Sequence, residues 1–99
     1  MSYRVRLSPG ARADFVRHYA YLLEFDEYVA VRAVAAIETS FKMLEAFPFA
    51  CRKMSAENPF LRELVIPFGS AGYVALFEID DSETVTILAV RHQREDDYH

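Results

Sequence analysis

The end of the chain holds the densest group of side chains that could carry out chemistry. Two arginines, a histidine and a tyrosine follow a predicted strand: Arg91, His92, Arg94 and Tyr98. A guanidinium can stabilise negative charge that develops on a phosphate, and a histidine or tyrosine can carry a proton. With Arg62 on another predicted strand, the group would suit metal-independent cleavage of RNA. The alternative is that the arginines only pair with the acidic residues at 95–97, because such surface ion pairs are common.

The other candidate motifs indicate structure rather than chemistry. The histidines lack the spacing of a metal site, so no metal or other cofactor is expected. Residues 69–72 lie between predicted strands with no helix after them, which makes them a turn and not a phosphate-binding loop. Cys51, the single cysteine, has no neighbouring histidine and is expected to be a small buried residue. His18 is expected to be a surface or packing residue.

Length and composition limit the class of protein. The 99 residues, 53% of them hydrophobic and 26% charged, fit a single domain spanning residues 1–99. One cysteine excludes an intramolecular disulfide and suits a reducing compartment. No apolar run approaches the ~18 residues of a membrane span, and residues 1–6 lack the apolar region of a signal peptide. We therefore expect a cytoplasmic protein without a membrane partner.

The net charge of −4 is unevenly distributed. Its sign argues against non-specific binding to nucleic acid as the main activity. Residues 1–17 nevertheless carry a net charge of +3, because four arginines outnumber Asp14. These are Arg4, Arg6, Arg12 and Arg17. Arginine favours bidentate contacts with carboxylate or phosphate, so the acidic total conceals a basic N-terminal segment.

Two amphipathic helices are predicted in the first half of the chain. Ser8 and Pro9 are typical of a helix cap followed by the first helical residue, and apolar residues at helical spacing continue to about residue 25. Asp26 caps a second helix, which ends near residue 46 before a Phe-Pro pair. The break between the helices is short, so they should form an antiparallel hairpin.

Alternating and continuous apolar runs predict four strands. The first covers residues 3–8, and three more follow the helices at 61–66, 73–79 and 84–91. Short connections should make these last three an antiparallel meander, whereas residues 48–59 are expected to be a loop. The order β-α-α-β-β-β gives an α+β fold, in which the helical hairpin packs on one face of an antiparallel sheet. The first strand joins one edge, and the sequence does not say which edge.

Several apolar side chains lie outside the stripes that the helices turn toward the sheet. On the predicted helical hairpin they are Tyr21, Phe25, Tyr28 and Val31. Any one such residue is more often part of the core. As a group at helical spacing they indicate a surface for a partner.

Four segments carry a resemblance to a known family. They are the opening residues 3–11, the predicted helical hairpin, the Leu-Arg-Glu-Leu run at 61–64 and the ending at 87–98. In their order and spacing, over essentially the whole chain, these segments resemble the RelE/ParE superfamily of bacterial toxins. The resemblance implies a small cytoplasmic toxin encoded beside a cognate antitoxin that masks it.

Two activities divide that superfamily. RelE-like members cut messenger RNA on the ribosome, whereas ParE-like members inhibit DNA gyrase and cut nothing. The nuclease branch usually has an arginine directly after the tyrosine of the third strand, and another two residues after the fourth strand. These positions hold Val74 and Gln93 here. Loss of one donor aimed at developing negative charge typically costs a factor of ~10²–10³ in rate, so the resemblance favours a ParE-like gyrase inhibitor without catalytic residues.

Three functions remain open on this basis. In the gyrase inhibitor, the residues expected to contact the target are Arg91, His92, Arg94 and Tyr98. In a ribosome-dependent ribonuclease of the RelE type, the catalytic residues would be Arg62, Arg91, His92 and Tyr98. The third possibility is an inactive relative that still binds an antitoxin.

The expected antitoxin-binding residues fall into an apolar group and a basic group. A ParD-like antitoxin could lay an amphipathic helix on Tyr21, Phe25, Tyr28 and Val31, and continue as a strand on an open sheet edge. The basic residues of the N-terminal segment, Arg4, Arg6 and Arg12 together with Arg17, would attract an acidic antitoxin tail.

Overall fold

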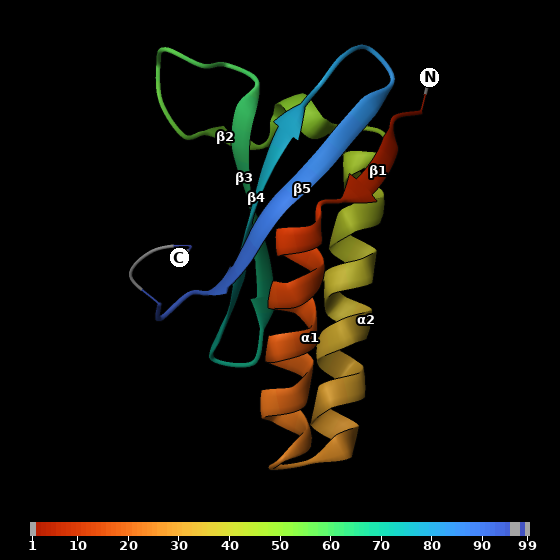
Figure 1. Ribbon diagram of the computed structural model, residues 1–99, viewed down its shortest axis with the longest axis vertical. Coiled ribbons are helices and arrows are strands. Elements are labelled where there is room, and N and C mark those ends of the chain that lie inside the picture. Colours follow the sequence, from red (N-terminus) through yellow and green to blue (C-terminus); the bar gives the residue numbers. More distant parts are fainter. Residues whose placement is uncertain (1, 96–97, 99) are drawn as a thin grey trace.

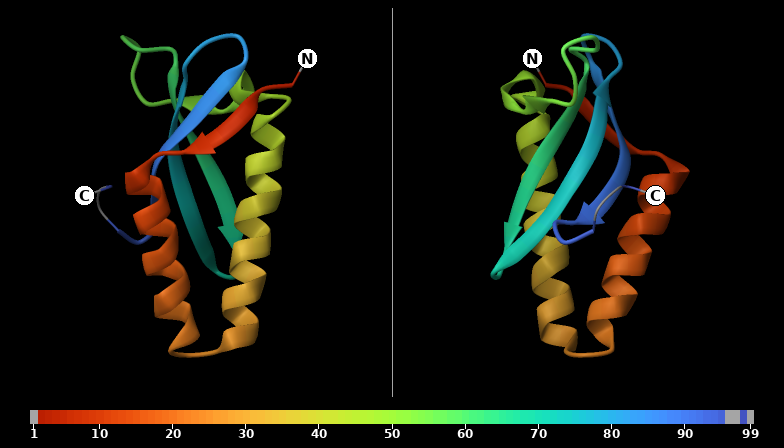
Figure 2. Two further views of the ribbon diagram at one scale, coloured as in Figure 1. Left: turned by 45° about the vertical axis from the view of Figure 1, so that its right-hand side comes forward. Right: turned by 90° about the vertical axis from the view of Figure 1, so that its left-hand side faces the viewer.

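The fold is a five-stranded sheet with a helical hairpin on one face (Figure 1). The computed structural model describes residues 2–95 and 98. Its elements are β1 (Arg4–Leu7), α1 (Pro9–Leu23), α2 (Glu27–Leu44), the short 3₁₀ helix η1 (Pro48–Ala50), β2 (Arg52–Lys53), β3 (Leu61–Phe68), β4 (Ala71–Ile79) and β5 (Thr84–His92). Figure 2 shows that α1 and α2 run side by side and extend beyond the sheet. The predicted α+β fold class is confirmed.

The sheet is mixed rather than purely antiparallel. Its strand order is β1-β5-β4-β3-β2, and β3, β4 and β5 form the expected antiparallel meander. The first strand pairs with β5 in parallel, from Arg4 opposite Thr84 to Leu7 opposite Ile87. The helical hairpin separates β1 from the other strands along the chain, so no tight turn imposes an antiparallel pairing. The predicted loop at residues 48–59 also contains η1 and the two-residue strand β2.

Both predicted helix caps are confirmed. The Ser8 hydroxyl accepts a hydrogen bond from the Ala11 N–H at 3.1 Å, and Pro9 follows as the first helical residue. The Asp26 carboxylate accepts one from the Tyr28 N–H at 2.8 Å. The two helices end two residues earlier than the sequence predicted. No helix in the described part of the chain is long and apolar enough to cross a membrane.

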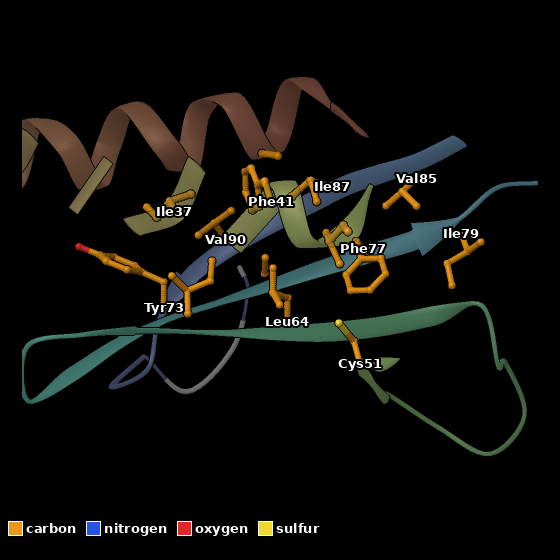
Figure 3. Close-up of a cluster of buried hydrophobic side chains, with 14 of the residues drawn as sticks. Ile37, Phe41, Cys51, Leu64, Tyr73, Phe77, Ile79, Val85, Ile87 and Val90 are labelled. Carbon is orange, nitrogen blue, oxygen red and sulfur yellow. The ribbon is translucent and has the colours of Figure 1, made fainter. Parts of the chain in front are cut away.

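The core lies between the helical hairpin and the inward face of the sheet (Figure 3). From α2 come Ile37, Phe41 and Leu44, and from the sheet come fully buried side chains such as Phe77 and Ile87. Each large apolar side chain contributes about 1.5–3 kcal/mol when fully buried. Cys51 is buried in the same cluster, as predicted. This core fixes α1 against β5, where the candidate site lies.

Candidate functional site

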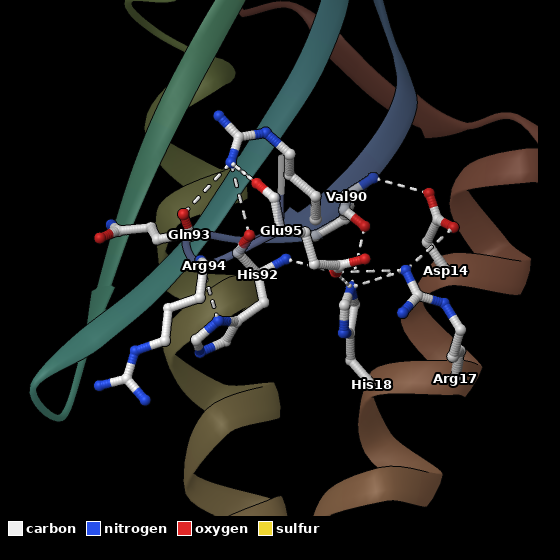
Figure 4. Close-up of polar contacts among 9 residues, drawn as sticks. Asp14, Arg17, His18, Val90, His92, Gln93, Arg94 and Glu95 are labelled. Atoms are coloured by element: carbon white, nitrogen blue, oxygen red, sulfur yellow. Dashed lines mark hydrogen bonds and ion pairs between the residues drawn. The ribbon is translucent and has the colours of Figure 1, made fainter. Parts of the chain in front are cut away.

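Two side chains of α1 complete the hydrogen bonding of β5 where β1 no longer covers it (Figure 4). The Val90 N–H donates to the Asp14 carboxylate at 2.9 Å, and Nε2 of His18 lies 2.9 Å from the Val90 carbonyl oxygen. A carbonyl only accepts, so we assign the proton of the His18 ring to Nε2. Spaced four residues apart, the two side chains share one face of the helix.

The sequence did not predict that Asp14 would accept a hydrogen bond from the backbone of β5, although it contains an indication of this role. Asp14 and His18 interrupt the apolar stripe of α1 that begins at Ala11 and continues to Leu22. Polar residues on a buried stripe need hydrogen-bond partners, and here the strand supplies them. His18 was expected to be either a surface or a packing residue, and the structure shows the second, since only 7% of it is exposed.

The remaining polar groups at the end of β5 are linked through Glu95. Its carboxylate accepts a hydrogen bond from the His92 N–H at 2.9 Å and lies 3.5 Å from the Arg17 guanidinium. Although desolvation acts to raise it, the pKa of Glu95 is lowered by the His92 N–H and by Arg17. Arg17 also lies 3.7 Å from Asp14. The segment after β5 is therefore tied to α1.

A cavity of about 820 Å³ opens beside this network. It lies between α1, the turn joining β3 to β4 and the segment that follows β5, with Arg17 and Arg94 among its lining residues. Three of its rings make edge contacts: His18 with Tyr73 at 5.1 Å between centroids, and Tyr73 with His92 at 5.5 Å. The cavity therefore combines aromatic walls with two guanidinium groups and the Glu95 carboxylate, which already lies 3.5 Å from Arg17. Arg94 is thus the lining guanidinium best placed for an acid that flanks an apolar anchor.

Burial sets the protonation of the aromatic wall. Desolvation lowers the pKa of His18 below its ordinary value of 6.5, outweighing the hydrogen bond to Val90 that raises it. Desolvation also raises the pKa of Tyr73. The neutral forms of both rings are therefore favoured.

The structure separates the predicted C-terminal cluster onto two faces of the sheet. His92 and Arg94 line the cavity beside α1. Successive side chains on a strand point to opposite faces, and the Arg91 guanidinium instead lies 5.1 Å from the Tyr98 ring centroid. We call the face of the sheet away from the helices the open face. Arg91 and Tyr98 meet there, and His92 does not join them.

Arg91 and Tyr98, on the open face, both make hydrogen bonds to other groups of the chain. The Tyr98 hydroxyl donates to the Glu63 carboxylate, which also accepts from Arg52 Nε at 2.9 Å. Desolvation first, and then Glu63, raise the pKa of Tyr98 well above its ordinary value of 10. The Arg91 guanidinium donates to the Glu95 carbonyl at 2.9 Å. Sequence reasoning missed Glu63, which becomes visible only once β3 and the C-terminal segment are side by side.

Arg62 does not reach the other members of the proposed catalytic group. It is 8% exposed, and its guanidinium donates to three backbone carbonyls at 2.8 Å each. These belong to Phe49, Cys51 and Pro59. On β3, Arg62 alternates with Glu63 and therefore points away from the open face. The structure thus gives Arg62 a structural role under the loop around η1.

The apolar residues expected to bind an antitoxin are exposed at the tip of the helical hairpin. The exposed fractions are 62% for Tyr21, 71% for Phe25, 71% for Tyr28 and 53% for Val31. The rings of Tyr21 and Phe25 contact each other at 5.1 Å between centroids, and Tyr21 also lines the cavity. We call these four residues the hairpin patch, which is continuous with the cavity through Tyr21.

Three of the basic residues expected to attract an antitoxin tail lie farther away, whereas Arg17 lines the cavity beside the hairpin patch. Arg4 and Arg6 are exposed on β1, and Arg12 is exposed in the first turns of α1. Arg6 donates to the Thr86 hydroxyl at 2.8 Å and lies 3.7 Å from Asp80. The 15 residues of α1 span about 22 Å, so one partner must extend along this helix to contact both groups.

Metal ligands do not cluster in the part of the chain that the structure describes. Across residues 2–95 and 98, no group of three His, Cys, Asp or Glu side chains could hold a metal ion.

Comparison with known proteins gives one family and a consistent fold. The family described as ParE toxin of type II toxin-antitoxin system, parDE, matches residues 5–97. Toxin RelE1 of Caulobacter vibrioides is 32% identical over 79 residues, which cover 80% of this chain and 82% of RelE1.

Two solved structures share the fold. One is described as the chromosomal ParDE TA system from P. aeruginosa, with a TM-score of 0.70, 21% identity and coverage of 92% of this chain and 96% of that one. The other is the RelBE2 toxin-antitoxin complex from Mycobacterium tuberculosis, with a TM-score of 0.61, 24% identity and coverage of 96% and 95%. Because the family match covers nearly all of the described fold, the chain belongs to the ParE toxins of type II toxin-antitoxin systems, within the RelE/ParE superfamily.

Proposed function

We propose that this toxin inhibits DNA gyrase by obstruction and that a ParD-like cognate antitoxin neutralises it in the cytoplasm. We choose gyrase because Arg91 and Tyr98, on the open face of the sheet, are already hydrogen-bonded to other groups of the chain. A ribonuclease needs a guanidinium available to phosphate and a group that can take up a proton. Here Arg91 donates to the Glu95 carbonyl, and Tyr98 donates to Glu63.

The electrostatics of the open face support the same choice. The Glu63 carboxylate would repel a phosphate placed beside Arg91. A tyrosine phenol is protonated at neutral pH, and the raised pKa of Tyr98 disfavours its deprotonation further, so it is poorly suited to act as a base. Val74 and Gln93 add no positive charge at the two positions where the nuclease branch carries arginine. A net charge of −4 is also poorly matched to the polyanionic ribosome.

The hairpin patch and the adjoining cavity are the proposed antitoxin site. An amphipathic helix could cover Phe25 and Tyr28 and insert an apolar anchor beside Tyr21. Acidic side chains of the same helix would meet Arg17 and Arg94 at the cavity. The similar structures are described as a ParDE system and a RelBE2 toxin-antitoxin complex, which supports an antitoxin as the partner.

The proposed target-binding residues now divide into two kinds. Arg94 and His92 line the cavity, whereas Arg91 and Tyr98 lie on the open face. If the proposal holds, Arg94→Ala should weaken inhibition of the target without lowering thermal stability, because its guanidinium is exposed. Lys42→Ala, which removes an exposed cation from α2, is the matched control. Unchanged inhibition in Arg94→Ala, Arg91→Ala and His92→Ala would remove this segment from the target interface.

The proposal is tested by two assays on the same purified chain. One measures supercoiling of relaxed plasmid by DNA gyrase, and the other measures cleavage of messenger RNA on translating ribosomes, each with and without the cognate antitoxin. The proposal predicts inhibition of supercoiling, reversal by the antitoxin and no cleavage. Cleavage would instead identify a RelE-like ribonuclease with Arg91 and Tyr98 on its active face. If the chain neither inhibits supercoiling nor cleaves RNA, it would instead be identified as an inactive relative that binds an antitoxin.

A further inference from the structure

A second group of exposed apolar side chains lies at the end of the molecule opposite the hairpin patch. The long axis measures 39 Å, and Figure 1 shows the α1–α2 connection at one end and the β4–β5 turn with residues 54–60 at the other. Phe49 and Phe60 are each 49% exposed at this second end. With Tyr3 they line a cavity of about 360 Å³. Tyr3 also packs against the core, but neither the core cluster nor the proposed antitoxin site includes Phe49 or Phe60.

The aromatic wall of this cavity is held in place by a buried cation. The rings of Phe49 and Phe60 meet edge-on, with their centroids 6.2 Å apart. Arg62 donates to the carbonyls of Phe49 and Pro59 at 2.8 Å each, and its guanidinium lies 5.1 Å from the Phe49 ring centroid. The Asn58 side chain accepts from the Phe60 N–H at 3.1 Å. The two segments that carry the rings are therefore joined before any ligand arrives, which lowers the ordering cost of binding.

The turn between β4 and β5 adds negative charge to the edge of this cavity. Asp80 and Asp81 are both lining residues, and Glu83 follows in the same turn. Asp81 accepts from the Glu83 N–H at 2.8 Å, which fixes the turn, and Asp80 pairs with Arg6 and Thr86. Within the described part of the chain, no cation pairs with Asp81. The cavity thus joins aromatic rings to an exposed carboxylate.

We propose that this cavity binds a basic side chain, arginine or lysine, presented by a protein partner other than the antitoxin. A cation is attracted by the electron-rich face of an aromatic ring and by a neighbouring carboxylate. Because the Arg62 guanidinium already lies over the Phe49 ring, Phe60 and Tyr3 are the rings left for an added cation beside Asp81. A nucleic acid is the wrong partner because Asp80, Asp81 and Glu83 would repel its phosphates. An antitoxin confined to the hairpin patch and its adjoining cavity leaves this site accessible at the opposite end of the molecule. The proposal does not depend on the identity of the toxin's target.

The test is a titration of the ¹⁵N-labelled full chain, followed by its amide NMR shifts. The probe is N-acetyl-arginine methylamide, and N-acetyl-norleucine methylamide is the uncharged comparison. The expected result is saturable shifts at Phe49, Phe60 and Asp81 with the arginine probe and weaker binding of norleucine. Phe60→Leu removes the ring but keeps an apolar side chain, and should weaken binding by about 2- to 30-fold.

A second variant keeps the test valid if the first one disturbs the fold. Asp81→Asn retains an oxygen that can accept from the Glu83 N–H, so it should weaken binding of arginine while leaving the thermal melt unchanged. Glu57→Gln, an exposed acid on the neighbouring loop that does not line the cavity, should leave binding unchanged. The proposal is overturned by equal binding of norleucine, by the absence of saturable shifts, or by an unchanged affinity in Asp81→Asn. Shifts that follow the concentration of the protein rather than of the probe would assign the cavity to a second copy of the chain, and would overturn it too.

Discussion

At the scale of single residues, Asp14 and His18 make hydrogen bonds to the backbone of β5, as a neighbouring strand does elsewhere in the sheet. β1 pairs with β5 only as far as Ile87, and Val90 lies beyond that point. The backbone N–H and carbonyl of Val90 are instead satisfied by the two side chains of α1. An unsatisfied buried backbone group is costly, so this arrangement stabilises the contact between α1 and the sheet.

Asp14→Ala should therefore destabilise the toxin. The substitution leaves the Val90 N–H without its acceptor in a buried site, and the expected loss is about 1–3 kcal/mol in the free energy of unfolding. Asp14→Asn keeps an acceptor oxygen at the same place and should lose less. Urea unfolding of the two variants measures the difference. Equal stability of the alanine variant and the original chain would show that this hydrogen bond contributes nothing.

His18 should make stability depend on pH near neutrality. Its pKa is lowered in the folded chain from an ordinary value of 6.5, so the unfolded chain binds the proton more readily. The contribution of His18 to the free energy of unfolding is therefore fully present above pH 6.5 and is lost as the pH falls toward the folded-state pKa. Unfolding in urea at about pH 7.5 and about pH 5.5 should show this loss, with a smaller one in His18→Gln. An identical loss in the glutamine variant would assign the effect to other groups.

Residue roles could be predicted where the decisive contact is local. Ser8 and Asp26 cap helices through bonds to residues two or three positions away, and both were predicted. Arg62 was expected beside Arg91, but its partners come from the loop around η1, which the sequence does not place next to β3. His92 and Arg91 separate because β5 continues through residue 92, one residue beyond the predicted end, and alternation then sends them to opposite faces.

At the scale of elements, the β3–β4 hairpin depends on a close approach at Gly72. Its φ is +152°, and a Cβ there would lie 2.1 Å from the Ile66 carbonyl oxygen. Gly72→Ala should therefore lower the free energy of unfolding by about 1–3 kcal/mol, because both the backbone conformation and the contact become strained. Thermal or urea unfolding gives the measurement.

Gly69→Asn is the control for that prediction. Gly69 has a φ of +62°, and no heavy atom of the surrounding chain lies within 4 Å of the place that a Cβ would take. Asparagine tolerates this left-handed conformation, so the change in stability should stay within about 0.5 kcal/mol. A loss in Gly69→Asn as large as that in Gly72→Ala would show that turn flexibility matters more than the close approach.

The elements themselves were mostly predictable, and their pairing was only partly so. Helical spacing and alternation identified both helices and the four main strands, and short connections fixed the meander of β3, β4 and β5. The parallel pairing of β1 with β5 joins residues about 80 positions apart. No local pattern specifies such a contact, and the short β2 likewise exists only because β3 lies beside it.

At the scale of the whole molecule, the apolar surface is divided between two ends. The hairpin patch lies at the tip of α1 and α2, and the aromatic cavity of Tyr3, Phe49 and Phe60 lies near the β4–β5 turn. The acidic net charge of the chain does not describe both ends, because arginines line the cavity beside the hairpin and aspartates line the other. Different partners can therefore be distinguished by which end they require.

Removing two aromatic rings from the hairpin patch should weaken antitoxin binding strongly. For the double variant Phe25→Ala with Tyr28→Ala, we expect a loss of affinity of about 30-fold or more, because exposed aromatic anchors dominate such interfaces. Phe47→Ala is the control, since Phe47 is similarly exposed at 65% but follows α2 at the other end. Calorimetric titration with the cognate antitoxin measures both. Equal affinity of the double variant and the control would place the antitoxin elsewhere.

The central claim is that this toxin obstructs its target rather than cutting RNA, and supercoiling by purified DNA gyrase tests it most directly. An obstructing inhibitor is used up by its target, so the amount of toxin needed should rise in proportion to the amount of gyrase, and added antitoxin should restore supercoiling. Full supercoiling in the presence of a large molar excess of folded toxin would contradict the account.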